Sequence, residues 1–223
     1  MGNLVVVPTP IGNMQDITLR ALSMLEKADI ILAEDTRQTG KLLKHFDITT
    51  RMRAFHKFNE HAQVDNIIQT ISQNTLTVLV SDAGTPAISD PGFLLVRECI
   101  QHAISVECLP GATAFVPALV VSGLSADRFC FEGFLPHKKG RHSRLLNLKD
   151  EERTIILYES PHRILKTILQ IQEYFGERNI VAIREISKKF EEVVRGNCAD
   201  VRNHFEIHKP KGEFVLVIEG KKK

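Results

Sequence analysis

The chain has 223 residues, of which 43% are hydrophobic and 25% are charged, and this ordinary globular composition excludes disordered, collagen-like and coiled-coil classes. The length suggests one large domain or two small ones. The 29 basic and 27 acidic residues leave a net charge of +2, so charge alone gives no indication of a nucleic-acid partner.

The first half of the chain alternates between predicted strands and predicted helices. Strands are expected at residues 4–7, 29–33, 76–80 and 104–109, and helices at 18–28, 37–46, 60–72, 93–102 and 112–121. In the first helix, the spacing of Leu19, Leu22 and Leu25 predicts a buried face, with Asp16 or Thr18 as the N-cap. Strands that are apolar throughout and alternate with helices predict a mostly parallel α/β sheet.

The turn-rich segment 123–127 is the predicted domain boundary, which gives an N-terminal domain of residues 1–123 and a C-terminal domain of residues 124–223. Beyond it, strands are expected at 129–134, 154–158, 180–183, 191–195 and 214–219, and helices at 164–175 and 199–206. Because these strands lie close together, the second domain is expected to be α+β with a mixed sheet.

Three loops rich in Gly, Pro, Ser and Thr follow predicted strands of the first domain, at residues 7–13 (VPTPIGN), 81–92 (SDAGTPAISDPG) and 110–114 (PGATA). Open α/β sheets bind ligands at the carboxyl ends of their strands. Glycine lets a ligand approach the main chain, and proline holds a loop in one shape. The loops therefore predict a crevice suited to an adenosine-containing cofactor, with ordinary tight turns as the alternative.

The four cysteines form no C-x-x-C pair, and the sequence contains no GxGxxG after a strand, no P-loop, no GxSxG elbow and no HExxH motif, so no metal site is expected. Apolar, strand-like neighbours predict that Cys108 and Cys130 are buried free thiols, as suits a reducing cytosol. No signal peptide and no apolar stretch approaching ~18 residues is evident, so we expect a soluble cytoplasmic protein.

Eight segments together resemble the motifs of the tetrapyrrole-methylase superfamily, and within it the branch that methylates the ribose 2′-hydroxyl of a cytidine in small-subunit ribosomal RNA. They run in order from Leu4 to Gly220 and cover nearly the whole chain. The segments are VPTPIGN, AEDTR (33–37), VSDAGTPAISDPG, LPGATA, GFLP (133–136), YESPHRI (158–164), REISKKFEEVVRG (184–196) and KGEFVLVIEG (211–220).

The resemblance implies a two-domain α/β fold, an N-terminal mostly parallel sheet and a C-terminal mixed α/β domain, with S-adenosylmethionine in the interdomain cleft and usually a homodimer. Many members carry a C-terminal extension, and because this sequence ends at Lys223, any RNA-holding role of that extension is expected to be absent or supplied otherwise. Carried over residue by residue, the implied cofactor contacts are Pro10, Asp82, Gly84, Ile88, Thr113, Ala114 and, through the main chain, Glu159 and Ala182.

Methyl transfer from a sulfonium needs no metal, because the leaving group is a neutral thioether. The protein must hold the ribose hydroxyl in line with the methyl group and help it lose its proton. Glu185 with Lys188, and Glu159 with Arg163, are the candidate catalytic residues. We favour Glu185 as a base or orienting acceptor, and structural ion pairs are the alternative for each.

The basic segment 137–144 (HKKGRHSR) predicts a loop that contacts RNA phosphates through Lys138, Lys139 and Arg141, with a solvated basic loop as the alternative. Further residues are expected at the substrate mouth or as base-stacking rings: Arg37, His56, Asn59, Glu60, Phe55 and Phe58. Two other functions stay open, C-methylation of a tetrapyrrole macrocycle on the same fold and a non-catalytic RNA-binding relative. A nucleotide-binding hydrolase is disfavoured by the missing motifs.

Overall fold

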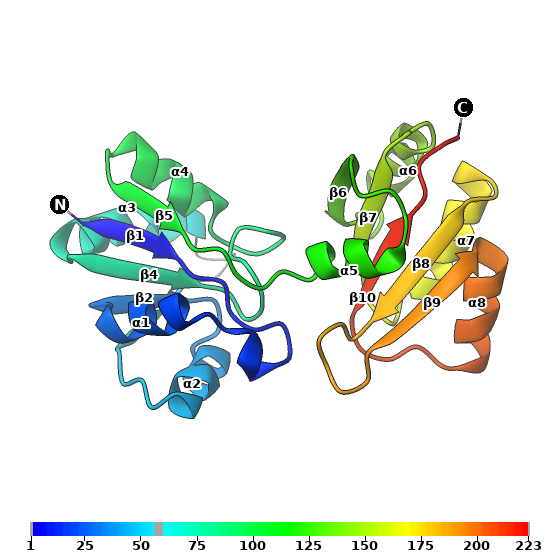
Figure 1. Cartoon of the computed structure of the whole chain (residues 1–223). Helices are drawn as coiled ribbons and strands as arrows, with labels where there is room; N and C mark the ends of the chain where they lie inside the picture. The colour runs from blue at the N-terminus through cyan, green and yellow to red at the C-terminus, as the bar shows by residue number, and fades with distance from the viewer. Residues whose placement is uncertain (1, 56–59, 223) are drawn as a thin grey trace. The chain divides into compact units, whose positions relative to one another are not determined.

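The computed structural model describes residues 2–55 and 60–222 (Figure 1), and the chain divides into two compact units, Met1–Thr113 and Ala114–Lys223. The first unit holds a five-stranded, fully parallel sheet in the order β3-β2-β4-β1-β5. Its elements are β1 (Asn3–Val6), η1 (Met14–Asp16), α1 (Leu19–Lys27), β2 (Ile30–Ala33), α2 (Thr36–His45), β3 (Met52–Ala54), α3 (Glu60–Gln73), β4 (Leu76–Val80), α4 (Phe93–Gln101) and β5 (Ser105–Cys108).

Helices cover both faces of this sheet (Figure 1), which is why its central strands are largely apolar. Val5 and Val7 pack in a core with α1 and α2, whereas Leu4 and Val6 pack in a second core with α3 and α4. Successive side chains of β1 therefore enter opposite cores, as the two-residue period of a strand requires. The predicted parallel sheet is confirmed. Strand β3, with three residues, was too short to be predicted.

The first helix departs from its expected packing. The hydroxyl of Thr18 accepts a hydrogen bond from the Ala21 N–H, so Thr18 is the N-cap. Ala21 and Leu25 form the buried face, but Leu19 is 86% exposed. Six residues of an α-helix separate Leu19 from Leu25, which places the two side chains about 120° apart. The expected inward position of Leu19 is therefore wrong.

The second unit holds a mixed sheet in the order β6-β7-β10-β8-β9, in which only β6 and β7 are parallel. The predicted mixed sheet is confirmed. Its elements are α5 (Phe115–Ser122), β6 (Phe129–Phe134), α6 (Arg141–Leu148), β7 (Thr154–Glu159), α7 (Ile164–Phe175), β8 (Asn179–Arg184), β9 (Glu192–Asn197), α8 (Cys198–Ile207) and β10 (Phe214–Ile218).

Helix α5 belongs to the second unit, so the chain divides earlier than the expected boundary between residues 123 and 124. The helix packs on β7, β8 and β10. The Phe115 ring stacks on that of Phe131 with centroids 4.7 Å apart, and the Arg195 guanidinium donates hydrogen bonds to the Val121 and Ser122 carbonyls. The turn after α5, which the sequence marks clearly, is thus a turn within a unit.

Helix α6 occupies part of the segment expected to be a basic loop. Its inward positions are Arg141, Leu145 and Leu148, which share one face at helical spacing. The apolar pattern of α6 is hidden in the sequence because an arginine holds the first buried position.

All four cysteines are free, but Cys108 is exposed rather than buried because β5 is an edge strand paired only with β1. None of the helices in the described residues has both the length and the apolar character to cross a bilayer.

Leu25→Ala should lower the free energy of unfolding by about 2–5 kcal/mol, because the substitution opens a cavity in a filled core. The matched change Leu19→Ala should move it by less than about 0.5 kcal/mol, because that side chain is exposed. Urea unfolding of both variants measures the difference, and equal effects would contradict this packing of α1.

Candidate functional site

The structure brings the three Gly- and Pro-rich loops of the first unit together at the carboxyl edge of its sheet. Strand β1 lies between β4 and β5, so the loops that follow these strands are neighbours. Thr9 and Gly84 exchange two main-chain hydrogen bonds of 2.9 Å. The Thr85 hydroxyl donates to the Ala112 carbonyl at 3.0 Å. The loops are therefore fixed to one another by hydrogen bonds.

The main chain of these loops takes conformations that favour particular residues. Gly84 has a φ of +82°, and Ala87 and Ser89 have φ values of +70° and +67°. Gly111 is needed for space, because a Cβ there would lie 2.7 Å from the Cβ of Pro8. Such a contorted, tightly packed loop exposes main-chain polar groups that a regular strand would use in its ladder.

Two carboxylates lie at the end of β4 and in the loop after β2. Asp82 accepts a hydrogen bond from the Asp35 N–H at 3.1 Å, and burial raises the pKa of Asp82. Asp35 forms a bidentate pair with Arg37, whose hydrogen bonds lower the pKa of Asp35 to about 2. The Arg37 side chain is 86% exposed, so the guanidinium lies at the surface, where an RNA contact is possible.

The group of residues at this edge fits the chemistry of an adenosine-containing sulfonium. Ile88 offers an exposed apolar side chain beside the contorted main chain, and Asp82 offers a carboxylate for hydroxyl or ammonium groups. A cavity of about 130 Å³ is lined by Pro10, Thr39 and Asp82, among others. Four of the expected cofactor residues of the first unit, namely Pro10, Asp82, Gly84 and Ile88, thus belong to one region.

The remaining motifs gather at one end of the strands of the second sheet. Phe214 at the start of β10 pairs with Glu159 at the end of β7 and with Arg184 at the end of β8. Phe134 at the end of β6 pairs with Tyr158. Segments that are far apart in the sequence, near residues 135, 160, 185 and 212, therefore leave the sheet side by side.

Glu159 is buried at this end of the strands and is bonded on all sides by its own unit. One oxygen accepts from the Ser160 N–H at 2.8 Å and lies 3.3 Å from Arg163 Nε, and the other accepts from the Thr167 hydroxyl at 2.6 Å. The side chain is only 1% exposed. This geometry does not support the Glu159 carboxylate as a proton acceptor for substrate, and it makes that side chain a positioning group. The main-chain cofactor contact expected at Glu159 stays a prediction.

Arg141 and Arg163 hold the segment that joins β6 to α6. Arg141 is buried and donates to the Pro136 carbonyl, to Thr167 and to Gln170. Arg163 donates to the Leu135 carbonyl at 2.7 Å. The expectation that Arg141 contacts RNA is therefore wrong, because its guanidinium is enclosed. Arg163 likewise positions this segment.

The segment's two lysines, Lys138 and Lys139, are exposed, in keeping with their expected role as phosphate contacts.

Glu185 and Lys188 form a cluster with a third residue that sequence reasoning missed, Glu213. The Lys188 ammonium lies 3.0 Å from Glu185 Oε1 and 2.8 Å from Glu213 Oε2, and the Glu213 N–H donates to Glu185 Oε1 at 2.9 Å. Glu185 has a φ of +52°. Glu213 belongs to the KGEF segment, which is one of the motifs of the sequence. Its place beside the REISK segment follows only from the pairing of β10 with β8, so the sequence alone did not indicate it as a partner of Glu185.

The charges of this cluster support one another. Burial alone would raise the pKa of Glu185, but the Glu213 N–H and the Lys188 ammonium outweigh it, so the pKa is lowered. Burial alone would lower the pKa of Lys188, but the Glu213 and Glu185 carboxylates outweigh it, so the pKa is raised. The pair is thus an ionised carboxylate beside a protonated amine across the neutral range.

The other residues expected to contact the cofactor or the RNA lie in different surroundings. Ala182 is buried in the interior of β8, between β10 and β9, and its expected main-chain contact with the cofactor stays a prediction. Phe55 is fully buried and cannot stack on a base. Thr113 and Ala114 are half-buried at the division between the units. The other expected residues of this part of the chain, His56, Phe58 and Asn59 and the side chain of Glu60, lie outside the described residues.

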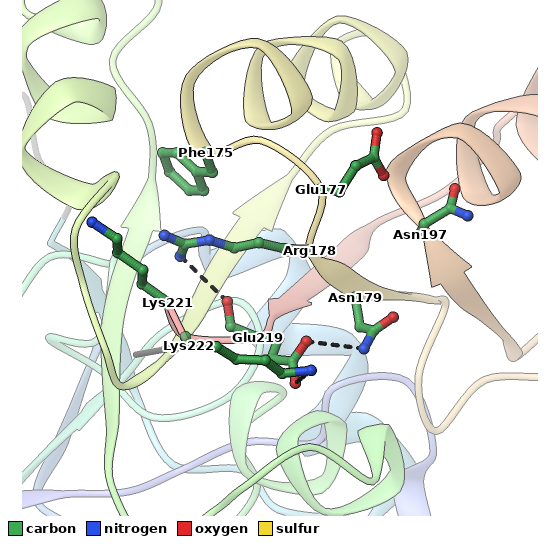
Figure 2. Close-up of a pocket in the computed structure, with 9 residues that line it drawn as sticks. Phe175, Glu177, Arg178, Asn179, Asn197, Glu219, Lys221 and Lys222 are labelled. Atoms are coloured by element: carbon green, nitrogen blue, oxygen red, sulfur yellow. Dashed lines mark hydrogen bonds and ion pairs between the residues drawn. The ribbon is translucent and has the colours of Figure 1, made fainter.

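A second cavity, of about 410 Å³, lies at the opposite end of the strands of the second sheet (Figure 2). Asn179, which begins β8, and Glu219, which follows β10, both line it. Its polar groups bond within the protein, since Arg178 donates to the Glu219 carbonyl, and Asn179 and Lys222 both bond the Glu219 carboxylate. The cavity therefore lies at the end of the strands opposite to Glu185 and Lys188, and several of its charged groups are paired within the protein.

His204 on α8 and His208, the C-cap of that helix, have ring centroids 4.7 Å apart, and His204 Nε2 lies 2.8 Å from Glu192 Oε1. Within residues 2–55 and 60–222, no group of three His, Cys, Asp or Glu side chains is arranged to hold a metal ion. This histidine pair therefore gives no evidence of a metal site.

Comparisons with known proteins agree on one family. The model of the tetrapyrrole (corrin/porphyrin) methylases matches residues 3–202. The ribosomal RNA small subunit methyltransferase I of Pasteurella multocida is 51% identical over 100% of this chain and 80% of its own length. The protein of the same name from Thermotoga maritima is 43% identical over 99% of this chain and 100% of its own length.

Solved structures share the fold at low sequence identity. A diphthine synthase has a TM-score of 0.77 at 14% identity, covering 98% of this chain and 90% of its own. The methyltransferase CobJ has a TM-score of 0.73 at 16% identity, covering 99% and 95%. These likenesses concern the fold alone.

Gly212→Ala should displace the Glu185 carboxylate, because the added Cβ would collide with its Cδ, Cγ and Oε1 atoms. We expect a loss of stability of about 2–5 kcal/mol, from the positive φ and from overpacking. Gly140→Ala is the matched control, because its φ is also positive but a Cβ there meets nothing within 4 Å, so it should cost only about 1–2 kcal/mol. Thermal unfolding compares the two, and equal losses would contradict the close contact.

Proposed function

The chain belongs to the tetrapyrrole methylase family, and from this we propose that it is an S-adenosylmethionine-dependent enzyme that methylates the RNA of the small ribosomal subunit. The observation that carries the proposal is the identity of 43–51% across nearly the full chain to relatives named ribosomal RNA small subunit methyltransferase I. The finer assignment, to the ribose 2′-hydroxyl of a cytidine, rests on the motifs that the sequence shares with that branch.

Methylation of a tetrapyrrole is the weaker alternative. The solved corrin and porphyrin methyltransferases that resemble this chain are only 15–19% identical to it, a level that supports a common fold and nothing about the substrate. A non-catalytic RNA-binding relative is also weaker, because the ionised Glu185–Lys188 pair and the bonded cofactor loops are both in place.

When bound, S-adenosylmethionine supplies a methyl group on a positively charged sulfur. We propose that Pro10, Gly84 and Ile88 contact it through main chain and apolar surface, and that Asp82 accepts hydrogen bonds from its hydroxyl or ammonium groups. Thr113, Ala114 and the main chain of Glu159 and Ala182 complete the proposed set. A position of the cofactor between the two domains remains a prediction from the family resemblance.

Glu185 and Lys188 are the residues that we propose act on the acceptor hydroxyl. A carboxylate whose pKa is lowered is a weak base, so Glu185 is suited to orient the ribose O–H first and to accept its proton late, once the oxygen has become acidic. Lys188 stays protonated and places positive charge where the oxygen becomes negative. Glu159 and Arg163 act through the segment that they position.

The RNA contacts proposed for this chain are Lys138 and Lys139, in the segment between β6 and α6, and Arg37 at the start of α2. Lysine and arginine at a surface contact phosphates and fix the register of an RNA without reading its sequence. A cytoplasmic location and a homodimer, both consistent with an enzyme that modifies ribosomal RNA, stay proposals.

Mapping of 2′-O-methyl groups at nucleotide resolution, on small-subunit RNA treated with the protein and S-adenosylmethionine, tests the function. We expect one new methylated cytidine, and no methyl transfer to RNA would contradict the proposal.

Glu185→Gln should lower turnover by roughly 100-fold or more while cofactor affinity is unchanged. Because the pKa of Glu185 is lowered, the acid limb of the wild-type pH profile should lie below the ordinary glutamate value of 4.5.

Lys138→Glu combined with Lys139→Glu should weaken RNA binding and reduce the salt dependence of the affinity, because two phosphate contacts are lost. Lys221→Glu with Lys222→Glu is the matched control, since it changes charge equally at the opposite end of the strands of the second sheet. Affinity titrations at several salt concentrations measure both, with cofactor binding expected to be unchanged. An equal effect of the two pairs would indicate a net-charge effect only.

A further inference from the structure

The connection between β8 and β9 is a tightly bonded turn that holds an exposed aromatic ring. The Lys188 N–H donates to the Glu185 carbonyl at 3.0 Å, and the Glu191 N–H donates to the Lys188 carbonyl at 3.1 Å. The Ser187 N–H donates to the Glu191 carboxylate at 2.6 Å, and Glu185 and Ser187 both have a positive φ. The turn is therefore fixed in shape.

Phe190 lies at the exposed side of this turn. The residue is 65% exposed, although a buried phenylalanine would contribute more to stability. The Lys189 ammonium lies 5.6 Å from the ring centroid, which places a cation over one part of the aromatic surface. The Phe190 carbonyl accepts from the Arg184 guanidinium at 3.4 Å, so the residue's main chain is held at the end of β8.

The position of the ring relates it to both proposed functional groups of the second unit. It follows Glu185 and Lys188 by a few residues in the same bonded turn. Lys138 and Lys139 follow β6, which lies three strand positions from β8 in the sheet. They leave the sheet at the same end of the strands as the turn after β8. Three strand spacings amount to ~14 Å, a length that a few nucleotides of single-stranded RNA cover.

We propose that Phe190 and Lys189 form a platform on which an unpaired base of the substrate RNA stacks, next to the nucleotide that is methylated. An exposed aromatic ring beside a cation recognises bases in single strands, because every base has a π-face and every nucleotide a phosphate. The stacked base fixes the strand, so that the target ribose reaches Glu185. This inference rests on the proposed function and adds the conformation of the RNA that the enzyme accepts, an unpaired strand.

The test uses a fluorescently labelled single-stranded oligocytidylate and small-subunit RNA. Phe190→Ala should weaken oligocytidylate binding about tenfold or more and raise KM for the RNA, with cofactor affinity unchanged. Phe190→Tyr should restore binding, whereas Phe190→Leu, which is apolar without a π-face, should not. Ile207→Ala removes another exposed apolar side chain, 78% exposed on α8, and should change nothing.

Three outcomes would overturn the platform. Full binding by Phe190→Leu would mean that apolar surface is sufficient and that no stacking occurs. Equal affinity of wild type and Phe190→Ala, in a protein that methylates RNA, would remove Phe190 while leaving the proposed function intact. A change of sedimentation coefficient in Phe190→Ala would assign the ring to a contact between proteins. If the wild-type protein methylates no RNA at all, it is the proposed function that fails.

Discussion

The order of strands in the two sheets is the constraint on which both candidate functional regions depend. In the first unit β1 lies between β4 and β5, so that three loops far apart in the sequence become neighbours and bond to one another through Thr9, Gly84 and Thr85. In the second unit β10 lies between β7 and β8. This order places Glu213 beside Glu185 and Lys188.

In the second unit, buried charged residues hold the segments that follow β6 and β7. Glu159, Arg141 and Thr167 form an enclosed group, and Arg163 joins it to the segment that carries the exposed lysines. Removing one partner of such a buried pair costs about 3–5 kcal/mol, because the other charge is left uncompensated. The arrangement explains how a strongly basic segment is held in place by the buried Arg141 while its two lysines reach solvent.

The Glu185–Lys188–Glu213 cluster combines positive φ, close packing against Gly212 and paired charges. Backbone conformations of this kind persist only where the surroundings enforce them, and they are concentrated at functional sites. The same turn displays Phe190. A single connection therefore serves both the acceptor hydroxyl and the neighbouring base in the proposed reaction, and its rigidity preserves the alignment that methyl transfer needs.

The sequence by itself determined most of the element types, the parallel and mixed sheets and the family, because apolar periodicity, Gly- and Pro-rich loops and ordered motifs are local properties of the chain. It could not determine whether a charged residue faces the core or the solvent. Arg141 and Glu159 resemble surface groups in the sequence but are enclosed, whereas Leu19 and Cys108 are exposed. Tertiary structure alone decided these positions, because burial depends on which elements pack together. Strand order likewise brought Glu213 to Glu185 from 28 residues away, a separation that no local pattern spans.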